Sequence, residues 1–410
     1  MDNIAGSPVE GENFYGREKV VAHLREILAN DDILLLGPRR IGKTSTARAV
    51  MAAVRAEGWR AVEINVASCT NERDFLDKLE ATLKPELASF SEKAMSAIGD
   101  AFGKIGGRIK SVKIPVPGAG TVGVELGDDD VEDWTRVASD VLHLIAQADE
   151  RWLIYVDEMP IMLFNIIRND PQHGVPRVRR FLDWFRNDVR ALPDVRKVRW
   201  LVSGSVGLDT LVQEHGMADT INSMSHQGLA AYSDDVAMAM LGELATSYKI
   251  NLSNEDARHI VAAVQWPQPY YLQMAFHHLR TLMVEHSTAN PASLIEQAMD
   301  IMIQPNTDND FHYWEQRLGL QLCRTDADHA LALLNLAALD PNGARAENLL
   351  DIVQERMSNA TTDEAKRTFI RLRDILLRDA YWWAEEAVGI KRYRFRLEPL
   401  RRWWLRRNTL

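Results

Sequence analysis

Short apolar-rich runs alternate with longer stretches of helical spacing through the first half of the chain. Each run is four to six residues long, which is the length of a short buried strand. The runs occupy residues 33–36, 61–66, 152–156 and 198–203. The stretches with apolar residues every three or four positions fall at 17–29, 42–57, 71–83, 131–148 and 176–191. Strands that alternate with helices predict a parallel sheet with crossover connections.

The pattern changes near residue 225. Beyond residue 230 the apolar residues keep helical spacing until a short hairpin pattern near the C-terminus. We therefore expect an α/β part that ends near residue 225 and a helical part after it.

Residues 85–130 interrupt the alternation of strands and helices. A weakly amphipathic helical pattern at 88–105 is followed by strand-like residues at 109–114 and 121–126, with prolines and glycines between them. We interpret this segment as an insertion. The alternative that we favour for its role is an ordinary surface hairpin without one, because most insertions run over the surface.

The composition is that of a globular protein rather than a disordered chain. The sequence has 410 residues, of which 46% are hydrophobic and 26% charged, so we expect two or three domains. No apolar run approaches the ~20 residues that span a bilayer, and residues 1–16 lack the features of a secretory signal. The two cysteines, Cys69 and Cys323, are too few for a disulfide framework or a zinc cluster. We therefore expect a cytoplasmic protein.

The charge is unevenly distributed. The net charge is −10, yet the last twenty residues carry eight basic residues against Glu398, which gives +7 there and −17 for residues 1–390. The basic residues are Lys391, Arg392, Arg394, Arg396, Arg401, Arg402, Arg406 and Arg407. This segment, the basic tail, is either a solvated face that balances the acidic remainder or a contact for nucleic-acid phosphates.

The basic tail also has an apolar face. Leu397, Leu400 and Trp404 recur at helical spacing, so we expect them to be buried. Arg401, Arg402 and Arg406 should then point elsewhere.

A phosphate-binding motif follows the first apolar run. Residues 37–44, GPRRIGKT, match G-x-x-x-x-G-K-[ST] between a predicted strand and a predicted helix. Glycines let the backbone curl so that successive N–H groups point at phosphate oxygens, helped by the helix dipole. Lys43 would reach the β and γ phosphates, and Thr44, with Ser45 beside it, would give a hydroxyl to Mg²⁺. The expected nucleotide-binding residues here are Gly37, Pro38, Arg39, Arg40, Ile41, Gly42, Lys43, Thr44 and Ser45.

Hydrolysis also needs a carboxylate for Mg²⁺ and a group that orients water. Asp157 and Glu158 follow four apolar residues of the run at 152–156, at the strand end where open α/β sheets bind ligands. We expect Asp157 to hold the magnesium shell and Glu158 to polarise the attacking water. Two acids after a strand are also common as helix caps.

A third candidate element follows the run at 198–203. Ser203 and Ser205 lie on the same side of an extended strand, and either could bind the γ-phosphate or the water. We assign this role to Ser205. A plain strand-ending turn is the alternative.

Further segments extend the pattern over nearly the whole chain. They are FYGRE at 14–18, YVDEMP at 155–160, GS at 204–205, PYYLQ at 269–273, YRF at 393–395, PL at 399–400 and WW at 403–404. Together with the phosphate loop they make the sequence resemble the STAND-type and archaeal-type P-loop ATPases. These are a branch of the additional-strand class, related to AAA+ proteins and origin-recognition ATPases.

The resemblance implies an ATP/ADP and Mg²⁺ site closed by a lid. Gly16 and Arg17 would lie against the adenine and ribose, and Pro269 would lie near the base. The family usually has a glycine two residues before that proline, where this chain has Pro267.

The resemblance also implies a C-terminal winged helix, which residues 325–398 can supply. Helical patterns at 331–339, 346–356 and 364–377 precede two aromatic strands at 381–383 and 393–395, which flank Gly389. The expected fold is therefore a P-loop ATPase domain (1–225), a parallel sheet between helices, followed by a helical lid (226–320) and a winged-helix domain with the basic tail (321–410).

In AAA+ rings, an arginine from the neighbouring subunit completes each active site, and it usually lies shortly after the third strand motif. This chain has no arginine between Arg199 and Arg258, which argues against such a ring. Arg39, Arg40 or Arg186 could partly substitute, although each could equally be a solvated surface residue.

Three functions follow from these patterns. The first is a slowly hydrolysing ATP switch or scaffold, which could self-associate on ATP binding. The second is a DNA-handling ATPase that uses the winged helix and basic tail. The third is a nucleotide-stabilised adaptor for an effector protein such as a nuclease or toxin.

Overall fold

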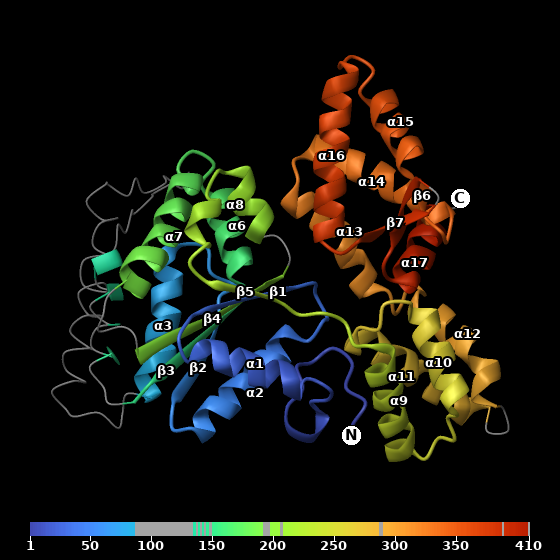
Figure 1. Cartoon of the computed structure of the whole chain (residues 1–410), viewed down its shortest axis with the longest axis horizontal. Coiled ribbons are helices and arrows are strands. Elements are labelled where there is room, and N and C mark those ends of the chain that lie inside the picture. Colours follow the sequence, from blue (N-terminus) through green and yellow to red (C-terminus); the bar gives the residue numbers. More distant parts are fainter. Residues whose placement is uncertain are drawn as a thin grey trace, which may run out of the picture. The chain divides into compact units, whose positions relative to one another are not determined.

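Figure 1 shows the computed structural model of the chain. It describes residues 1–86, 150–191, 197–205, 208–286, 290–387 and 389–408, with eight positions between 134 and 146. The expected insertion therefore lies outside the described residues, apart from Pro85 and Glu86 at the end of a helix.

The chain forms two compact units, each built from separate stretches of sequence. The sheet unit consists of residues 19–36 and 46–228. The helical unit consists of residues 1–18, 37–45 and 229–410. The nine residues of the phosphate loop thus belong to the helical unit, although strand β1 before them belongs to the sheet unit.

A five-stranded sheet of order β2-β3-β4-β1-β5 forms the centre of the sheet unit. The strands are β1 (Ile33–Gly37), β2 (Arg60–Asn65), β3 (Trp152–Asp157), β4 (Val198–Ser205) and β5 (Ser225–Gly228). The pairs β2–β3, β3–β4 and β1–β5 are parallel. Every residue of β3 is buried, as the apolar run at 152–156 predicts.

Helices flank the sheet (Figure 1). They are α1 (Glu18–Leu28), α2 (Lys43–Ala56), α3 (Glu72–Glu86), α6 (Met159–Asn169), α7 (Gly174–Ala191) and α8 (Leu208–Glu214). The described residues between 134 and 146 are also helical, as predicted for 131–148. The structure adds α6, α8 and β5, which the sequence patterns did not predict.

Aromatic side chains fill one side of the sheet unit. Trp134 stacks on Phe181 with ring centroids 5.9 Å apart and meets Trp184 edge-on at 5.3 Å. Trp200 of β4 packs at 5.0 Å against Phe185. These contacts fix α7 against β4.

The first part of the helical unit is a set of five helices. They are α9 (Asp234–Tyr248), α10 (Asn254–Val264), α11 (Pro269–Glu285), α12 (Pro291–Met302) and α13 (Asn309–Gln321). A capping box between Ser253 and Asp256 starts α10. Asn290 caps α12, and a proline follows it at the first helical position.

The second part has the order of elements expected for a winged helix. Helices α14 (Arg324–Leu339), α15 (Ala346–Arg356) and α16 (Thr362–Arg378) precede the antiparallel strands β7 (Trp382–Ala387) and β8 (Ile390–Phe395). The short strand β6 (Ala344–Arg345) pairs with β8, and α17 (Glu398–Asn408) follows. Gly343 has φ +77°, and a Cβ there would lie 2.3 Å from the Tyr393 carbonyl oxygen. The β6–β8 pairing therefore requires glycine at this position.

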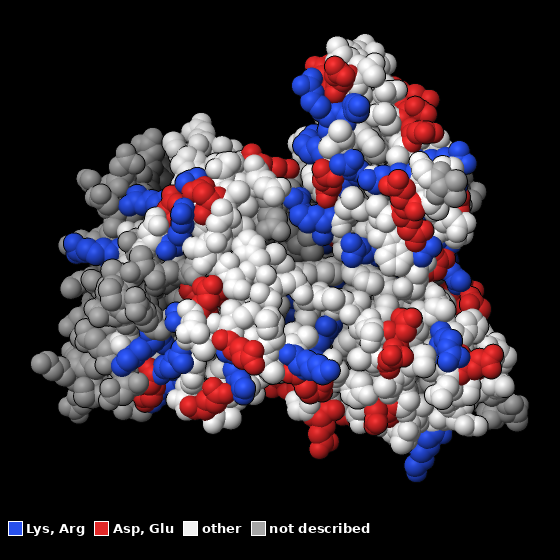
Figure 2. Space-filling model, viewed as in Figure 1, with Lys and Arg blue, Asp and Glu red and all other residues white. Residues whose placement is uncertain are grey.

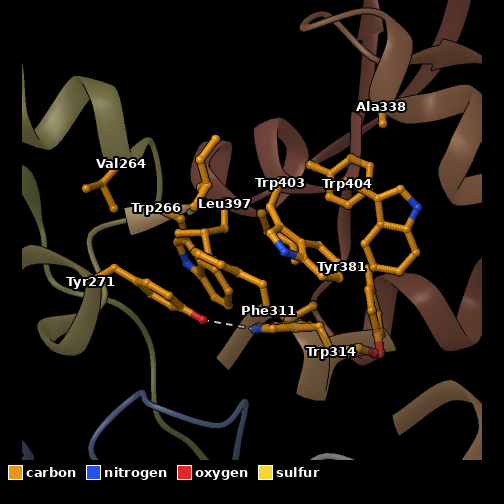
Figure 3. Close-up of a cluster of buried hydrophobic side chains, with 14 of the residues drawn as sticks. Val264, Trp266, Tyr271, Phe311, Trp314, Ala338, Tyr381, Leu397, Trp403 and Trp404 are labelled. Atoms are coloured by element: carbon orange, nitrogen blue, oxygen red, sulfur yellow. Dashed lines mark hydrogen bonds between the residues drawn. The ribbon is translucent and has the colours of Figure 1, made fainter. Parts of the chain in front are cut away.

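One hydrophobic core joins both parts of the helical unit (Figure 3). Trp314 of α13 donates from Nε1 to the Tyr271 hydroxyl of α11 at 3.0 Å. The Tyr381 hydroxyl donates to the Trp314 carbonyl oxygen at 2.6 Å. Phe311 stacks on Trp403 of α17. The boundary expected between residues 320 and 321 thus falls inside one core.

A buried ion pair crosses the same boundary. Arg317 of α13 and Asp379 after α16 lie 3.0 Å apart, and their side chains are 3% and 0% exposed. Removing one partner would leave a buried charge without its counter-ion, so the pair ties α13 to α16.

None of the helices in the described part of the chain combines the length and apolar character that spanning a bilayer requires.

Candidate nucleotide site

The loop between β1 and α2 has the backbone that a phosphate-binding loop needs. Gly37 and Gly42 have φ of +155° and +98°, which glycine adopts without a steric penalty. A Cβ on Gly37 would lie 3.2 Å from both Ile41 Cγ2 and the Leu229 carbonyl oxygen. Arg40 also has a positive φ, +70°, although it carries a Cβ. The curl expected from the glycines is present, and an arginine takes part in it.

Lys43 folds back over this loop. Its ammonium donates to the carbonyl oxygens of Gly37 at 2.8 Å and Pro38 at 3.0 Å. Lys43 is also the first residue of α2, whose N-terminus carries a partial positive charge. The loop therefore concentrates positive potential on its inner side, where phosphate oxygens are expected.

The two hydroxyl residues after Lys43 differ in their environment. Ser45 is buried, and its Oγ accepts from the Val9 N–H at 3.0 Å. Thr44 is half-buried. Ser45 thus anchors the N-terminal segment to the loop, and the magnesium-ligand role of Thr44 stays a prediction.

Both loop arginines contact α13, although the side chain of Arg39 is 40% exposed and that of Arg40 22%. Arg40 donates from Nε at 3.0 Å and from Nη2 at 2.7 Å to one carboxylate oxygen of Asp310. The Arg39 guanidinium lies 4.0 Å from the ring centroid of Tyr313. Arg186, the third suggested substitute for a ring arginine, pairs with Asp219 of the sheet unit at 3.1 Å.

Gly16 and Arg17 are packed beside the loop. A Cβ on Gly16, where φ is +67°, would lie 2.5 Å from Val236 Cγ1. Arg17 is 6% exposed and donates to the Ile41 carbonyl oxygen at 3.2 Å. Its guanidinium lies 4.7 Å from the ring centroid of Tyr232. Burial lowers the pKa of Arg17 despite this neighbour.

Tyr232 is a site-forming residue that the sequence patterns missed. Its hydroxyl donates to the Tyr15 carbonyl oxygen at 2.7 Å, and its N–H donates to the Pro267 carbonyl oxygen at 3.0 Å. Burial raises its pKa to about 12, so it stays protonated at neutral pH. Tyr232 therefore joins the Gly16 segment to the start of α11, whose first residue is Pro269. No motif marks it in the sequence.

Asp157 ends β3 in a buried network of hydroxyl groups. Its carboxylate accepts from Ser203 Oγ of the adjacent strand β4, and the Tyr155 hydroxyl lies 3.0 Å from that same Oγ. Asp157 is 5% exposed, and its carbonyl oxygen accepts from the Val66 N–H. The carboxylate is thus held at the carboxyl end of the sheet.

Glu158 has a left-handed backbone, with φ 61° and ψ 36°, just before α6 begins. This conformation is disfavoured for a residue with a Cβ and persists where the surroundings impose it. Part of the restraint comes from Gly204, where a Cβ would lie 2.4 Å from Pro160 Cγ at the start of α6. The turn that presents Glu158 is therefore packed tightly against the end of β4.

The structure describes the side chain of only one of the two candidate serines of β4. Ser203 is fully buried and bound to Asp157. The Ser205 side chain lies outside the described residues, so its assignment to the γ-phosphate stays a prediction.

In the sheet unit, β1, β4 and β3 are neighbours. The β3–β4 pair is parallel and in register from Trp152 opposite Val198 to Val156 opposite Val202. Gly37, the first residue of the phosphate loop, is the last residue of β1, and Asp157 is the last residue of β3, with Glu158 after it. In open parallel sheets such strand ends carry the ligand site.

The chain has the P-loop NTPase fold. Its structure is similar to the Walker-type ATPase of Pyrococcus abyssi, with a TM-score of 0.58, 13% sequence identity and 96% of each chain covered. It is also similar to the ORC2 protein of Aeropyrum pernix, solved as ADPNP–ADP complexes, with a TM-score of 0.52, 14% identity and 97% of each chain covered. No protein-family model matches the sequence, and no curated protein matches it either. The P-loop NTPase fold expected from the sequence is thereby confirmed.

Arg401, Arg402 and Arg406, which we expected to point elsewhere than the buried face of the tail, differ in exposure: Arg401 is buried, Arg402 is half-buried and Arg406 is exposed. The expectation is therefore wrong for Arg401. Arg401 is 8% exposed; it pairs with Glu398 at 2.6 Å and donates to the Ala338 carbonyl oxygen at 2.8 Å. Arg402 pairs with Glu296 of α12 at 3.0 Å, and Arg406 donates to the Ile303 carbonyl oxygen at 3.3 Å. The sequence shows the charges of the tail but not the acids and carbonyl groups that the fold places opposite them.

Each of the other basic residues of the tail also has a partner within the helical unit. Arg392 pairs with Asp340, Arg394 with Glu385 and Arg407 with Glu315. Arg396 and Lys391 lie over the rings of Trp266 and Tyr393. The burial predicted for Leu397, Leu400 and Trp404 is confirmed, since each is 1% exposed.

The same mixture of charges appears on the visible surface. Figure 2 shows lysine and arginine side chains interspersed with aspartate and glutamate over α15 and α16.

Proposed function

We propose that this chain is an ATP-binding and slowly hydrolysing molecular switch. The observation that supports it most is the loop at 37–45, with its glycine backbone and Lys43 curled over it, at the start of α2 in a P-loop NTPase fold. STAND-type behaviour is the form of switch that the sequence resemblance favours.

Phosphate binding would fall to Lys43 and the loop N–H groups. The Lys43 ammonium would exchange its carbonyl contacts for β- and γ-phosphate oxygens, forming charge-assisted hydrogen bonds. The α2 N-terminus adds its dipole. Gly16, Arg17 and Pro269 would then line the adenine and ribose side, as the resemblance implies.

Thr44 and Asp157 provide a hydroxyl and a carboxylate, the hard oxygen donors that Mg²⁺ prefers. Mg²⁺, when bound, neutralises charge on the β and γ oxygens. Among the described residues no three or more His, Cys, Asp and Glu side chains form a metal cluster. A magnesium shell here would therefore depend on nucleotide oxygens and water as well.

Glu158 would activate the water. The water oxygen attacks the γ-phosphorus while Glu158 accepts a proton, and the β–γ bridging oxygen leaves with its bonding electrons as part of ADP. The left-handed turn at Glu158 would hold the carboxylate in place for this step.

Slow turnover is expected because the arginines that could stabilise the transition state are engaged elsewhere. Arg40 is bound to Asp310 and Arg186 to Asp219, and the sequence has no arginine between Arg199 and Arg258. An arginine that stabilises the transition-state charge on the γ-phosphoryl group can accelerate hydrolysis by roughly 10³-fold or more. A slow reaction suits a switch, since the ATP state then persists.

The helical unit would respond to the nucleotide as one body. Its two parts share a core and the Arg317–Asp379 pair, so the winged-helix part would move together with α9–α13. In many switch proteins, segments that the γ-phosphate holds in an ordered state are released after hydrolysis.

The decisive experiment measures binding of a fluorescent ATP analogue, with phosphate release in the presence of Mg²⁺. We expect wild-type protein to bind and to release phosphate slowly, and Lys43→Ala to lose binding by at least ~100-fold because it removes the charge at the phosphates. Lys19→Ala, an exposed change on α1, is the matched control. Affinity of Lys43→Ala within about threefold of wild type would refute the phosphate-loop assignment.

Sizing the purified protein with ADP and with an ATP analogue tests self-association. DNA binding through the basic tail is the weaker candidate, because the charges of the tail are already matched by acids and carbonyl groups of the helical unit.

A further inference from the structure

Arg40 stands at a position of the phosphate loop where the backbone is left-handed. Its φ is +70°, between Gly37 and Gly42. Residues with a Cβ avoid this region, and those found in it are held there by their surroundings. An αR–αL succession of residues also turns neighbouring N–H groups to one side, which is what an anion-binding loop needs. The conformation of Arg40 is therefore part of the shape of the loop.

Three residues hold the Arg40 side chain, namely Asp310, Gly6 and Tyr270. Nε and Nη2 donate to the same Asp310 oxygen at 3.0 and 2.7 Å, and Nη1 donates to the Gly6 carbonyl oxygen at 2.8 Å. The guanidinium also lies 4.3 Å from the ring centroid of Tyr270. The side chains of Arg40 and Asp310 are 22% and 16% exposed, so this is a partly buried pair that water screens only weakly.

Asp310 is itself held firmly. The Tyr270 hydroxyl donates to its second oxygen. Burial, and then the Asp310 carboxylate, raise the pKa of Tyr270, so that this donor stays protonated. The next residue of α13, Phe311, is 2% exposed and stacks on Tyr271 and Trp403 in the core that Figure 3 shows. Asp310 is thus a fixed point on the rigid part of the helical unit.

We propose that Asp310 is a positioning residue for the phosphate loop: through Arg40 it maintains the left-handed turn, and it thereby couples phosphate occupancy of the loop to α13. This inference rests on the proposed nucleotide binding and deepens it by naming the connection between the phosphate loop and α13. Coupling is reciprocal, so phosphate binding must stabilise the Arg40–Asp310 contact as much as the contact favours phosphate binding.

Arg40 has two roles, one through its side-chain contact with Asp310 and one through its left-handed backbone. Substitution by alanine alone would affect both. Arg40→Ala removes the anchor and keeps a Cβ, so the loop should relax away from positive φ. Arg40→Gly also removes the anchor, but glycine adopts φ +70° without a penalty. Glycine should therefore restore the shape of the loop without restoring its connection to α13.

The test measures the affinity for ATP and ADP of Arg40→Ala, Arg40→Gly, Asp310→Asn and the double variant Arg40→Gly/Asp310→Asn. We expect Arg40→Ala to bind both nucleotides about tenfold more weakly than wild type, and Arg40→Gly to recover at least about threefold of that loss. Asp310→Asn should weaken binding about fivefold, and should have no further effect in the Arg40→Gly background. Glu315→Gln is the matched control on α13, since its partner is Arg407.

Hydrogen exchange provides a second readout that a purely structural role would not change. Nucleotide should slow amide exchange of residues 309–321 in wild type, and this response should be lost in Arg40→Gly even at saturating nucleotide.

Each failure has a distinct meaning. Wild type that binds neither nucleotide overturns the proposed function and this inference together. Wild type that binds, with Arg40→Gly no tighter than Arg40→Ala, overturns the inference alone. So does an Asp310→Asn effect that is the same size in both backgrounds, or α13 protection that survives in Arg40→Gly. If Asp310→Asn fails to fold, the alanine–glycine comparison still decides.

Discussion

Ser203 at the end of β4 donates a hydrogen bond to the Asp157 carboxylate at the end of β3. The Tyr155 hydroxyl completes a buried chain of three groups, 3.0 Å from Ser203 Oγ. Hydrogen bonds to a buried carboxylate fix its orientation as well as satisfying it. This contact lies within the sheet unit, and it makes Ser203 the support of the residue expected to hold magnesium.

Ser203→Ala should therefore weaken the use of Mg²⁺. We expect phosphate release to fall about tenfold and to need more Mg²⁺ for half-maximal rate, since loss of an outer-shell partner commonly costs 10- to 100-fold. Tyr155→Phe, which removes the hydroxyl one step further from the carboxylate, should have a smaller effect. A Mg²⁺ titration of phosphate release checks both, and an unchanged curve for Ser203→Ala would contradict the supporting role.

Glu158→Gln should bind ATP normally and hydrolyse it at least ~100-fold more slowly, because the amide cannot accept the proton of the attacking water. Single-turnover hydrolysis separates this effect from binding. Glu26→Gln on α1, an exposed acid-to-amide change, serves as the control. Undiminished turnover would move the role of base to Asp157.

Within the basic tail, burial should decide which arginine matters for stability. Arg401→Gln removes a partly buried pair and a bond to a helix-terminal carbonyl, so we expect the free energy of unfolding to fall by about 2 kcal/mol. Arg407→Gln should cost less than about 1 kcal/mol, since an exposed ion pair contributes little; the Arg407 side chain is 42% exposed. Urea unfolding of both variants measures the difference, and equal losses would argue against this ranking.

Because the charges of the tail are matched within the protein, we also predict that the tail contributes little affinity for DNA. We expect no measurable tail-dependent duplex binding near physiological salt, in either nucleotide state. Fluorescence anisotropy at several salt concentrations checks this. A slope of about −0.9 per neutralised phosphate in log[salt], flattened by up to ~3 in an Arg401/Arg402/Arg406 glutamine variant, would instead support the DNA-handling function.

His278 predicts how the stability of the protein depends on pH. Burial, with the neighbouring His277 adding to it, lowers the pKa of His278 to about 4. Between that value and the ordinary pKa of about 6.5, the unfolded chain binds a proton that the folded chain does not. The stabilisation is therefore complete above about pH 6.5 and is lost as the pH falls toward 4.

His278→Gln should flatten this pH dependence. We expect the fall in the free energy of unfolding between pH 7 and pH 4.5 to shrink by about 2 kcal/mol relative to wild type. Urea unfolding at several pH values provides the comparison, since all other titrating groups are common to both proteins. Parallel curves would show that His278 is protonated equally in both states.

Local patterns predicted the parts of the fold that depend on neighbouring residues. The strands that carry the phosphate loop and Asp157 are short apolar runs. Helices such as α16 have regular apolar spacing and strong caps, here Thr361 with Glu364. Strand β5 was missed because its residues, SHQG, are polar and pair only along one edge of β1. Helix α6 was missed because nearly half of its residues are buried, including both Met159 and Pro160 at its start.

The contacts that the sequence did not predict join residues that lie far apart in the chain. Tyr232 reaches Tyr15 across 217 positions, and Arg401 reaches Ala338 across 63. Neither contact leaves a periodic or motif signal in the sequence. Ser203 was considered, but Ser205 was preferred for the site, because alternation along a strand cannot show which serine meets the acid of the next strand.

The contact between Arg40 and Asp310 spans 270 residues of sequence, which has a consequence for the order in which the protein is made. A ribosome adds roughly 5–20 residues per second, so a nascent chain carries its phosphate loop for some tens of seconds before the partner of Arg40 has been synthesised. During that interval α2 and the early strands can form, but the loop lacks the aspartate proposed to hold its left-handed turn. Chains that stop before residue 309 should then be poor nucleotide binders, and full-length synthesis would itself act as a checkpoint on when the site first becomes competent.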